Sequence, residues 1–151
     1  MEIDFSKYNG AGNDFILIDD RDNLINDNKL LISYLCDRHF GVGADGLIIL
    51  KESNNCDFEI LHYTSDGNLG SLCGNGSRCA VLFAYNKDII GRKTVFNAFD
   101  GIHSAEILDN GLIKMEMNVN SNIVSNSYGT FIDTGSPHLV IEKNNTDELD
   151  V

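Results

Sequence analysis

The stretch LCGNGSRCA, residues 72–80, places a cysteine directly before a Gly-Asn-Gly turn and then enters an apolar segment. Leu82 and Phe83 follow Cys79 after three and four residues, which is the spacing of one face of a helix. We therefore predict a helix over residues 76–90, with the first cysteine of the stretch just before its first turn.

Short strands outnumber helices in the rest of the chain. Apolar and polar residues alternate over residues 2–8 and 57–64, which is typical of half-buried strands. The side chains expected to point inward are Ile3, Phe5, Phe58, Ile60 and His62. Further strands are predicted at residues 15–19, 46–50, 94–99, 112–119 and 138–142.

A second helix is predicted over residues 28–38, where Leu31, Tyr34 and Leu35 form an apolar stripe. Turns rich in Gly, Asn and Asp join the strands, as in SDGN at residues 65–68. Strands and helices do not alternate, which disfavours a doubly wound sheet. The pattern predicts an α+β fold with a mainly antiparallel sheet or barrel.

Composition limits the classes of protein and partner. A chain of 151 residues with 42% hydrophobic residues and one proline can bury a core, and its apolar stretches are too short to span a bilayer. Lys and Arg total 11 against 23 Asp and Glu, and the net charge of −12 repels polyphosphate and anionic lipid. We expect neither a nucleic-acid nor a membrane partner. The N-terminal residues do not resemble a secretory signal, so we expect a cytoplasmic protein.

One domain is predicted over residues 1–143. Residues 144–151 are polar and acidic, and we expect them to be a tail or the start of an interdomain linker. The chain then stops where another segment could begin.

The four cysteines show no C-x-x-C spacing and no neighbouring pair of histidines, which argues against a zinc site or a redox dithiol. We expect free thiols in a reducing cytosol. No lysine has surroundings typical of a pyridoxal site, so we expect neither a metal nor a cofactor. Cys36, Cys56 and Cys79 are interpreted as packing residues.

Cys73 lies just before a helix, beside unpaired backbone N–H groups and the positive end of the helix dipole, which favour its thiolate form. Gly74 and Gly76 allow the backbone to approach a ligand closely, and free N–H groups there can hold a carboxylate. Cys73 is therefore a candidate reactive thiol beside an anionic substrate. The alternative stays open that it is a small turn residue and that the glycines only shape the turn.

Two other glycine-rich pieces lie at residues 9–18 and 38–50. The first has no third glycine of a dinucleotide loop, and a strand rather than a helix follows each of them, so we reject nucleotide binding. Asn13 lies in the first piece. It either forms the turn or hydrogen-bonds a substrate carboxylate or amine.

Four segments carry a family resemblance: KYNGAGNDFILID (7–19), LCDRHFGVGADGLIIL (35–50), YTSDGNLGSLCGNGSRCA (63–80) and DTGSPHLVIE (133–142). In this order and at these separations they resemble the N-terminal half of the diaminopimelate epimerases. The resemblance spans nearly the whole chain, and its most specific part is the thiol before Gly-Asn-Gly with Arg78 after it.

The resemblance implies an isomerase that uses no cofactor and interconverts LL- and meso-diaminopimelate for lysine and peptidoglycan synthesis. Two cysteines act from opposite faces of the substrate's α-carbon, and Cys73 matches the first. The resemblance further implies that Asn13, Gly74 and Asn75 bind substrate, and that His138 tunes the pKa of the thiols. The implied fold is a mixed sheet rolled around a central helix.

The chain departs from the family pattern at three positions. Thr64 stands where a substrate-binding asparagine is usual, and its hydroxyl is expected to bind substrate instead. Gly46 stands where some members have glutamine, and Ser136 replaces an asparagine.

The family's second half, with its own cysteine, lies outside the chain. The first hypothesis is therefore an epimerase that needs a C-terminal half in the same or another chain. The second is a non-catalytic half-domain that binds a diamino acid or a partner, and a homodimer is also compatible with the sequence. A third is a proline racemase-like isomerase, but GNDF (12–15) and GADG (43–46) favour the first family.

Overall fold

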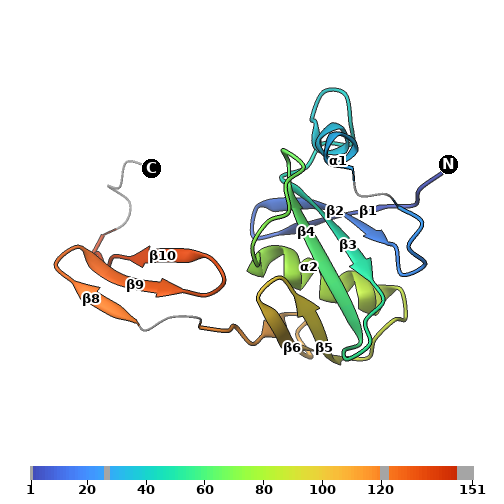
Figure 1. The fold of residues 1–151 in the computed structure, drawn as a ribbon. Coiled ribbons are helices and arrows are strands. Elements are labelled where there is room, and N and C mark those ends of the chain that lie inside the picture. Colours follow the sequence, from blue (N-terminus) through green and yellow to red (C-terminus); the bar gives the residue numbers. More distant parts are fainter. Residues whose placement is uncertain (1, 26–27, 120–122, 146–151) are drawn as a thin grey trace.

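The computed structural model describes residues 2–25, 28–119 and 123–145, which hold two helices and two sheets (Figure 1). The helices are α1 (Lys29–Cys36) and α2 (Gly74–Asn86). The strands are β1 (Ser6–Gly10), β2 (Asn13–Asp19), β3 (Gly46–Lys51), β4 (Phe58–Thr64), β5 (Lys93–Ala98), β6 (Gly101–Ile107), β7 (Ile113–Met115), β8 (Val124–Asn126), β9 (Gly129–Asp133) and β10 (Pro137–Val140).

The larger sheet holds seven strands in the order in which they occur along the chain, β1 to β7. β2 pairs with β3, and β4 with β5, in parallel, whereas the other neighbours are antiparallel. α2 packs against both edge strands, β1 and β7, so the sheet curls around this helix. The predicted α+β fold, a mixed and mainly antiparallel sheet around a central helix, is confirmed.

β2 and β3 are buried on both faces, because a helix covers each face. Phe15 and Ile48 point toward α2, whereas Ile16 and Ile49 point toward α1. This explains the continuous apolar runs of β2 and β3, because in a strand with one solvated face apolar and polar residues would alternate.

α2 begins two residues earlier than predicted, with Cys73 as its N-cap, and it ends at Asn86. It stops before the predicted residue 90 because Asp88 takes a φ of 56°, and the N–H of Ile89 turns back to the Ala84 carbonyl at 2.9 Å. The helix is buried along most of its length and fills the curl of the sheet.

The predicted helix over residues 28–38 is confirmed as α1, with Asn28 as its N-cap. The predicted stripe was wrong at Tyr34, which is 57% exposed, whereas Leu35 packs against the core beside the buried Ile32 and Cys36. The predicted strand over residues 2–8 is β1, which begins only at Ser6.

Phe5 was predicted to point inward and is instead half exposed, because it lies before the paired part of β1. Ala11 and Gly12 form the two-residue turn between β1 and β2, with φ angles of 53° and 93°. Such a turn joins antiparallel strands and matches their twist. The glycine-rich piece around residue 10 is therefore a hairpin.

β8, β9 and β10 form a separate antiparallel sheet, set apart from the main sheet in Figure 1. β8 and β9 were not predicted, and neither was β6 of the main sheet. Val124, Phe131, Leu139 and Val140 leave large apolar areas of this small sheet exposed. Of the predicted tail, residues 146–151 lie outside the described residues, and no described helix is long and apolar enough to cross a membrane.

Gly76 sets how closely α2 approaches the sheet. A Cβ at this position would lie 2.8 Å from Ile48 Cδ1 and 3.4 Å from the Phe15 ring. We expect Gly76→Ala to destabilise the fold by about 1–3 kcal/mol, because overpacking outweighs the gain of about 1 kcal/mol in helix propensity.

Gly74→Ala is the matched control in the same helical turn. Its Cβ would meet nothing closer than 3.6 Å, so its free energy of unfolding should change by less than about 1 kcal/mol. Urea unfolding followed by circular dichroism measures both. Equal stability of the two variants would contradict the packing role of Gly76.

Candidate active site

The start of α2 opens into a cavity of about 480 Å³ between the main sheet and the β9–β10 turn. The cavity is lined by His62, Thr64, Ser71, Leu72, Cys73, Gly74, Asn75, Met117, Thr134, Ser136 and His138. Five of the six predicted site residues therefore lie together, and they come from three distant parts of the chain. The sixth, Asn13, is not among the lining residues but accepts a hydrogen bond from Asn75.

Cys73 holds the first turn of α2 in place. Its Sγ accepts a hydrogen bond from the Gly76 N–H at 3.4 Å, and its carbonyl accepts one from the Ser77 N–H at 2.8 Å. Because a capping residue stands outside the helix, its side chain remains partly exposed and lines the cavity. The thiol therefore has both access to a ligand and a backbone donor at its sulfur.

The other three cysteines lie outside the cavity lining. Burial raises the pKa of Cys36 to about 11 and also raises the pKa of Cys79. Cys56 lies in the loop before β4. The packing role predicted for Cys36 and Cys79 agrees with their burial, whereas Cys56 is only partly buried.

Gly74 and Gly76 have different structural roles. Gly76 is buried against the core, so the prediction that it lets the backbone approach a ligand was wrong. Gly74 borders the cavity, where the N–H groups of the first helical turn have no partner within the helix.

Asn75 connects the cavity to the β1–β2 hairpin. Its Nδ2 donates to Asn13 Oδ1 at 2.8 Å, and its Oδ1 accepts a hydrogen bond from Arg78. Asn13 Nδ2 in turn lies 3.3 Å from Asp45 Oδ2. The structure thus places Asn13 as a support for Asn75, and both amides are oriented before any ligand arrives.

A cluster of charges anchors this support. Arg38 Nη2 lies 2.8 Å from both Asp14 Oδ1 and Asp45 Oδ1, and Lys7 Nζ lies 2.8 Å from Asp14 Oδ2. Hydrogen bonds from Arg38 and Lys7 hold the pKa of Asp14 well below its usual range. The Asp14 carboxylate therefore stays ionised, and the ion pairs of Arg38 with Asp14 and Asp45 fix the start of β2 against the loop before β3.

Thr64 borders the cavity at the end of β4. Its hydroxyl donates to Asp66 Oδ1 at 2.5 Å, within the turn that follows the strand. The proton is therefore engaged locally, and Thr64 has only its oxygen lone pairs to offer a ligand.

The β9–β10 turn carries Ser136 and His138 to the far side of the cavity. Ser136 Oγ lies 2.7 Å from Ser71 Oγ and donates to the Leu72 carbonyl at 3.4 Å, so it fastens the turn to the residues before Cys73. Gly135 makes this approach possible. With a φ of 93°, it has no room for a Cβ, which would lie 2.9 Å from Leu72 Cβ.

His62 lines the same cavity but was not predicted as a site residue. Its Nδ1 lies 3.1 Å from the Ser71 carbonyl oxygen, and burial lowers its pKa. The only sequence signal was a polar residue at the last inward position of β4, after Phe58 and Ile60.

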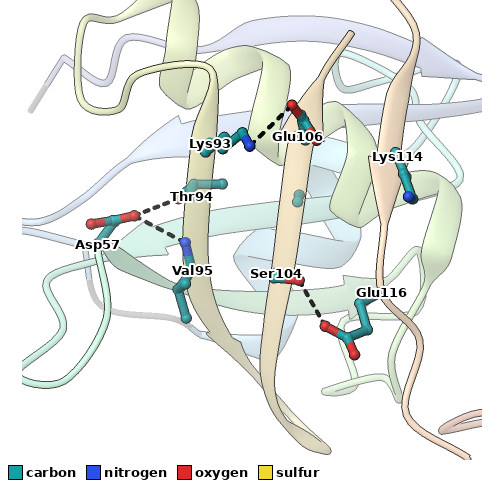
Figure 2. Close-up of a pocket in the computed structure, with 9 residues that line it drawn as sticks. Asp57, Lys93, Thr94, Val95, Ser104, Glu106, Lys114 and Glu116 are labelled. Carbon is teal, nitrogen blue, oxygen red and sulfur yellow. Dashed lines mark hydrogen bonds and ion pairs between the residues drawn. The ribbon is translucent and has the colours of Figure 1, made fainter.

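A larger concavity of about 710 Å³ lies on the outer face of β5, β6 and β7 (Figure 2). Its polar groups are largely paired: Lys93 with Glu106 at 3.4 Å, and Ser104 with Glu116 at 2.8 Å. Asp57 accepts from Thr94 Oγ1 and the Val95 N–H (Figure 2). No cysteine or histidine lines this groove, so the Cys73 cavity is the better candidate for chemistry.

A family model for diaminopimelate epimerase matches residues 5–122, which is more than half of the chain. The chain belongs to the diaminopimelate epimerase family. It is 48% identical over 147 residues to the diaminopimelate epimerase of Flavobacterium psychrophilum, and 36% identical over 168 residues to that of Aquifex aeolicus. These alignments cover 96% and 99% of this chain but only 57% and 60% of the relatives, so the chain spans little more than half their length.

Solved structures support the fold. A PhzF-family phenazine biosynthesis protein from Bacillus anthracis has a TM-score of 0.62 at 18% identity, over 79% of this chain and 42% of its own. A hydroxyproline epimerase from Agrobacterium vitis has a TM-score of 0.55 at 12% identity, over 85% and 46%. At these identities the likeness concerns the fold alone. Within residues 2–25, 28–119 and 123–145, no group of three or more His, Cys, Asp or Glu is placed to hold a metal ion.

The lowered pKa of His62 predicts a pH effect on stability. In the unfolded chain the pKa of His62 has the ordinary histidine value of 6.5, so on acidification the unfolded chain takes up this proton before the folded chain does. We expect the folded state to lose stability relative to a His62→Gln variant as the pH falls below about 7.

Urea unfolding at several pH values between about 5 and 8 measures the difference between the two proteins. His39→Gln, at an exposed position, is the control and should follow the wild type. A constant difference between wild type and His62→Gln across this range would show that His62 titrates normally.

Proposed function

We propose that this chain is the part of a diaminopimelate epimerase that carries the first catalytic cysteine, and that the complete enzyme interconverts LL- and meso-diaminopimelate for lysine and peptidoglycan-precursor synthesis. The observation that carries the proposal is the position of Cys73, which caps α2 and lines a cavity together with Gly74 and Asn75. Membership of the family supplies the substrate class.

The reaction begins with transfer of the α-proton to sulfur. In the proposed step the Cys73 thiolate takes the proton, the C–H bond breaks, an S–H bond forms, and the electron pair passes into the neighbouring carboxylate. N–H groups in the first turn of α2 donate to that carboxylate where the negative charge increases. No metal or cofactor is required by this proposal.

Inversion then requires a proton from the opposite face of the α-carbon. Of the four cysteines, Cys73 alone lines the cavity, so a second thiol has to come from outside this chain. We propose a C-terminal half, in the same or a separate chain, as its source. The relatives are longer than this chain by about the length of such a half.

The remaining lining residues complete the proposed site. Thr64 contributes an acceptor oxygen, Asn75 binds substrate with Asn13 as its support, and His138 adjusts the acidity of the thiols from the β9–β10 turn. We also propose a cytoplasmic protein, because all four cysteines are free thiols. The proline racemase-like alternative has only the fold in its favour.

The first test concerns the thiol. We expect limiting iodoacetamide near neutral pH to label Cys73 before the other cysteines, because Cys36 and Cys79 are buried and have raised pKa values. Peptide mapping measures the order of labelling. The same protein in urea is the control and should lose the preference, whereas faster labelling of Cys36 or Cys79 in the folded state would refute the assignment.

The second test concerns the missing half. With one thiol on one face, the isolated chain is expected to convert no LL- to meso-diaminopimelate above a Cys73→Ala control. Addition of a separately produced C-terminal half with the second cysteine should restore turnover, followed by chromatography of the isomers. Cys73-dependent turnover by the monomeric chain alone would overturn the two-half proposal, and an unreactive assembly would favour a non-catalytic binding module.

A further inference from the structure

The imidazole of His62 is tightly held in the wall of the Cys73 cavity. A Cβ at Gly70 would lie 2.8 Å from Nδ1, and a Cβ at Gly46 would lie 3.2 Å from Nε2. Phe15 meets the ring edge-on, with the ring centroids 5.9 Å apart. A side chain at either position would crowd the imidazole ring, so the surrounding backbone fixes the orientation of the ring.

The contact with Ser71 determines which ring nitrogen carries the proton. Nδ1 lies 3.1 Å from the Ser71 carbonyl oxygen, and a carbonyl oxygen can only accept, so Nδ1 is the donor. In the neutral ring Nε2 is then an acceptor with a free lone pair. Burial lowers the pKa of His62 and so favours the neutral ring at pH 7.

Nε2 has no hydrogen-bond partner among the described residues, yet it is not enclosed. Over the described ranges, the fully buried side-chain atoms without a partner are Ser77 Oγ and Asp100 Oδ2. Nε2 is not one of them, so it keeps contact with solvent, and the His62 side chain borders both the Cys73 cavity and a smaller cavity beside β4. Glycine at position 46 contributes to this, because any side chain there would stand beside Nε2.

The described lining of the cavity contains no Asp or Glu, although diaminopimelate carries an ammonium group at each end. Among the other side-chain acceptors, Asn75 Oδ1 already accepts from Arg78, whereas the Thr64 hydroxyl oxygen offers lone pairs only, because its proton is donated to Asp66. An ammonium group brings donors and no acceptor. A neutral imidazole with a free lone pair is an acceptor that suits such a group.

We propose that His62 determines specificity in this cavity by accepting a hydrogen bond at Nε2 from a substrate ammonium group. The inference rests on the proposed function, because it takes the ligand of the Cys73 cavity to be an amino acid. The other titratable groups of the lining are Cys73 and His138. Gly46 and His62 act as a pair, in which the glycine on β3 uncovers the acceptor on β4.

The test compares two alkylating probes at the same thiol. 2-Bromoethylammonium carries an ammonium group and iodoacetamide carries no charge, and peptide mapping gives the rate constant of each at Cys73. In the wild type at pH 7.5 the ammonium group can donate to Nε2. We expect the ratio of the two rate constants, cationic over neutral, to fall at least about threefold in His62→Phe.

Two variants complete the design. His39→Phe, the same change at an exposed site outside the cavity lining, should keep the wild-type ratio. His62→Gln, which retains an acceptor oxygen, should lie between wild type and His62→Phe, and circular dichroism verifies that each variant is folded. An unchanged ratio in folded His62→Phe and His62→Gln overturns the inference. If Cys73 is also labelled no faster than Cys36 and Cys79, the proposed function fails separately.

Discussion

The contact between the first turn of α2 and the inner face of β2 and β3 determines the geometry of the site. Gly76 brings the helix so near to Ile48 and Phe15 that a single added carbon would lie 2.8 Å from the Ile48 methyl group. Cys73, as the N-cap, is placed by that same turn. The position of the thiol is thus a property of the hydrophobic core, and a cap on a solvated helix would not be defined as closely.

Polar contacts then fix the orientation of the side chains beside the first turn of α2. Asn75 is held between Arg78 and Asn13, and Asn13 is bonded to Asp45, which pairs with Arg38. The ion pairs of this cluster are exposed and each contributes little stability. Their effect is to keep both amides in one orientation, so that binding a ligand does not have to order them.

Local signals explain which features could be predicted from the sequence. The two helices and the thiol before α2 depend on residues within one turn or one helix, and these predictions were confirmed as structure. The predicted stripe of α1 was wrong at Tyr34, because Ile32 is buried there instead, and only the packed sheet decides this. His62 was missed as a site residue because its role depends on two residues outside β4. Ser71 lies in the loop after β4, and Gly46 lies on β3. The gathering of Thr64 and His138 in one cavity followed from the family resemblance, since nothing local connects them.

The β9–β10 hairpin belongs both to the small exposed sheet and to the wall of the Cys73 cavity. β9 and β10 belong to a small sheet with exposed apolar residues such as Phe131 and Leu139, and the turn between them supplies Ser136 and His138 to the cavity. A surface that covered this sheet would also stand next to the open side of the cavity. The driving force for such an association is burial of apolar area, whereas its consequence is exclusion of water from Cys73 and from the charge that develops on the substrate. Under the proposed function, assembly with a second half and completion of the active site are therefore expected to be one event, and a chain that leaves the sheet exposed also leaves Cys73 open to water.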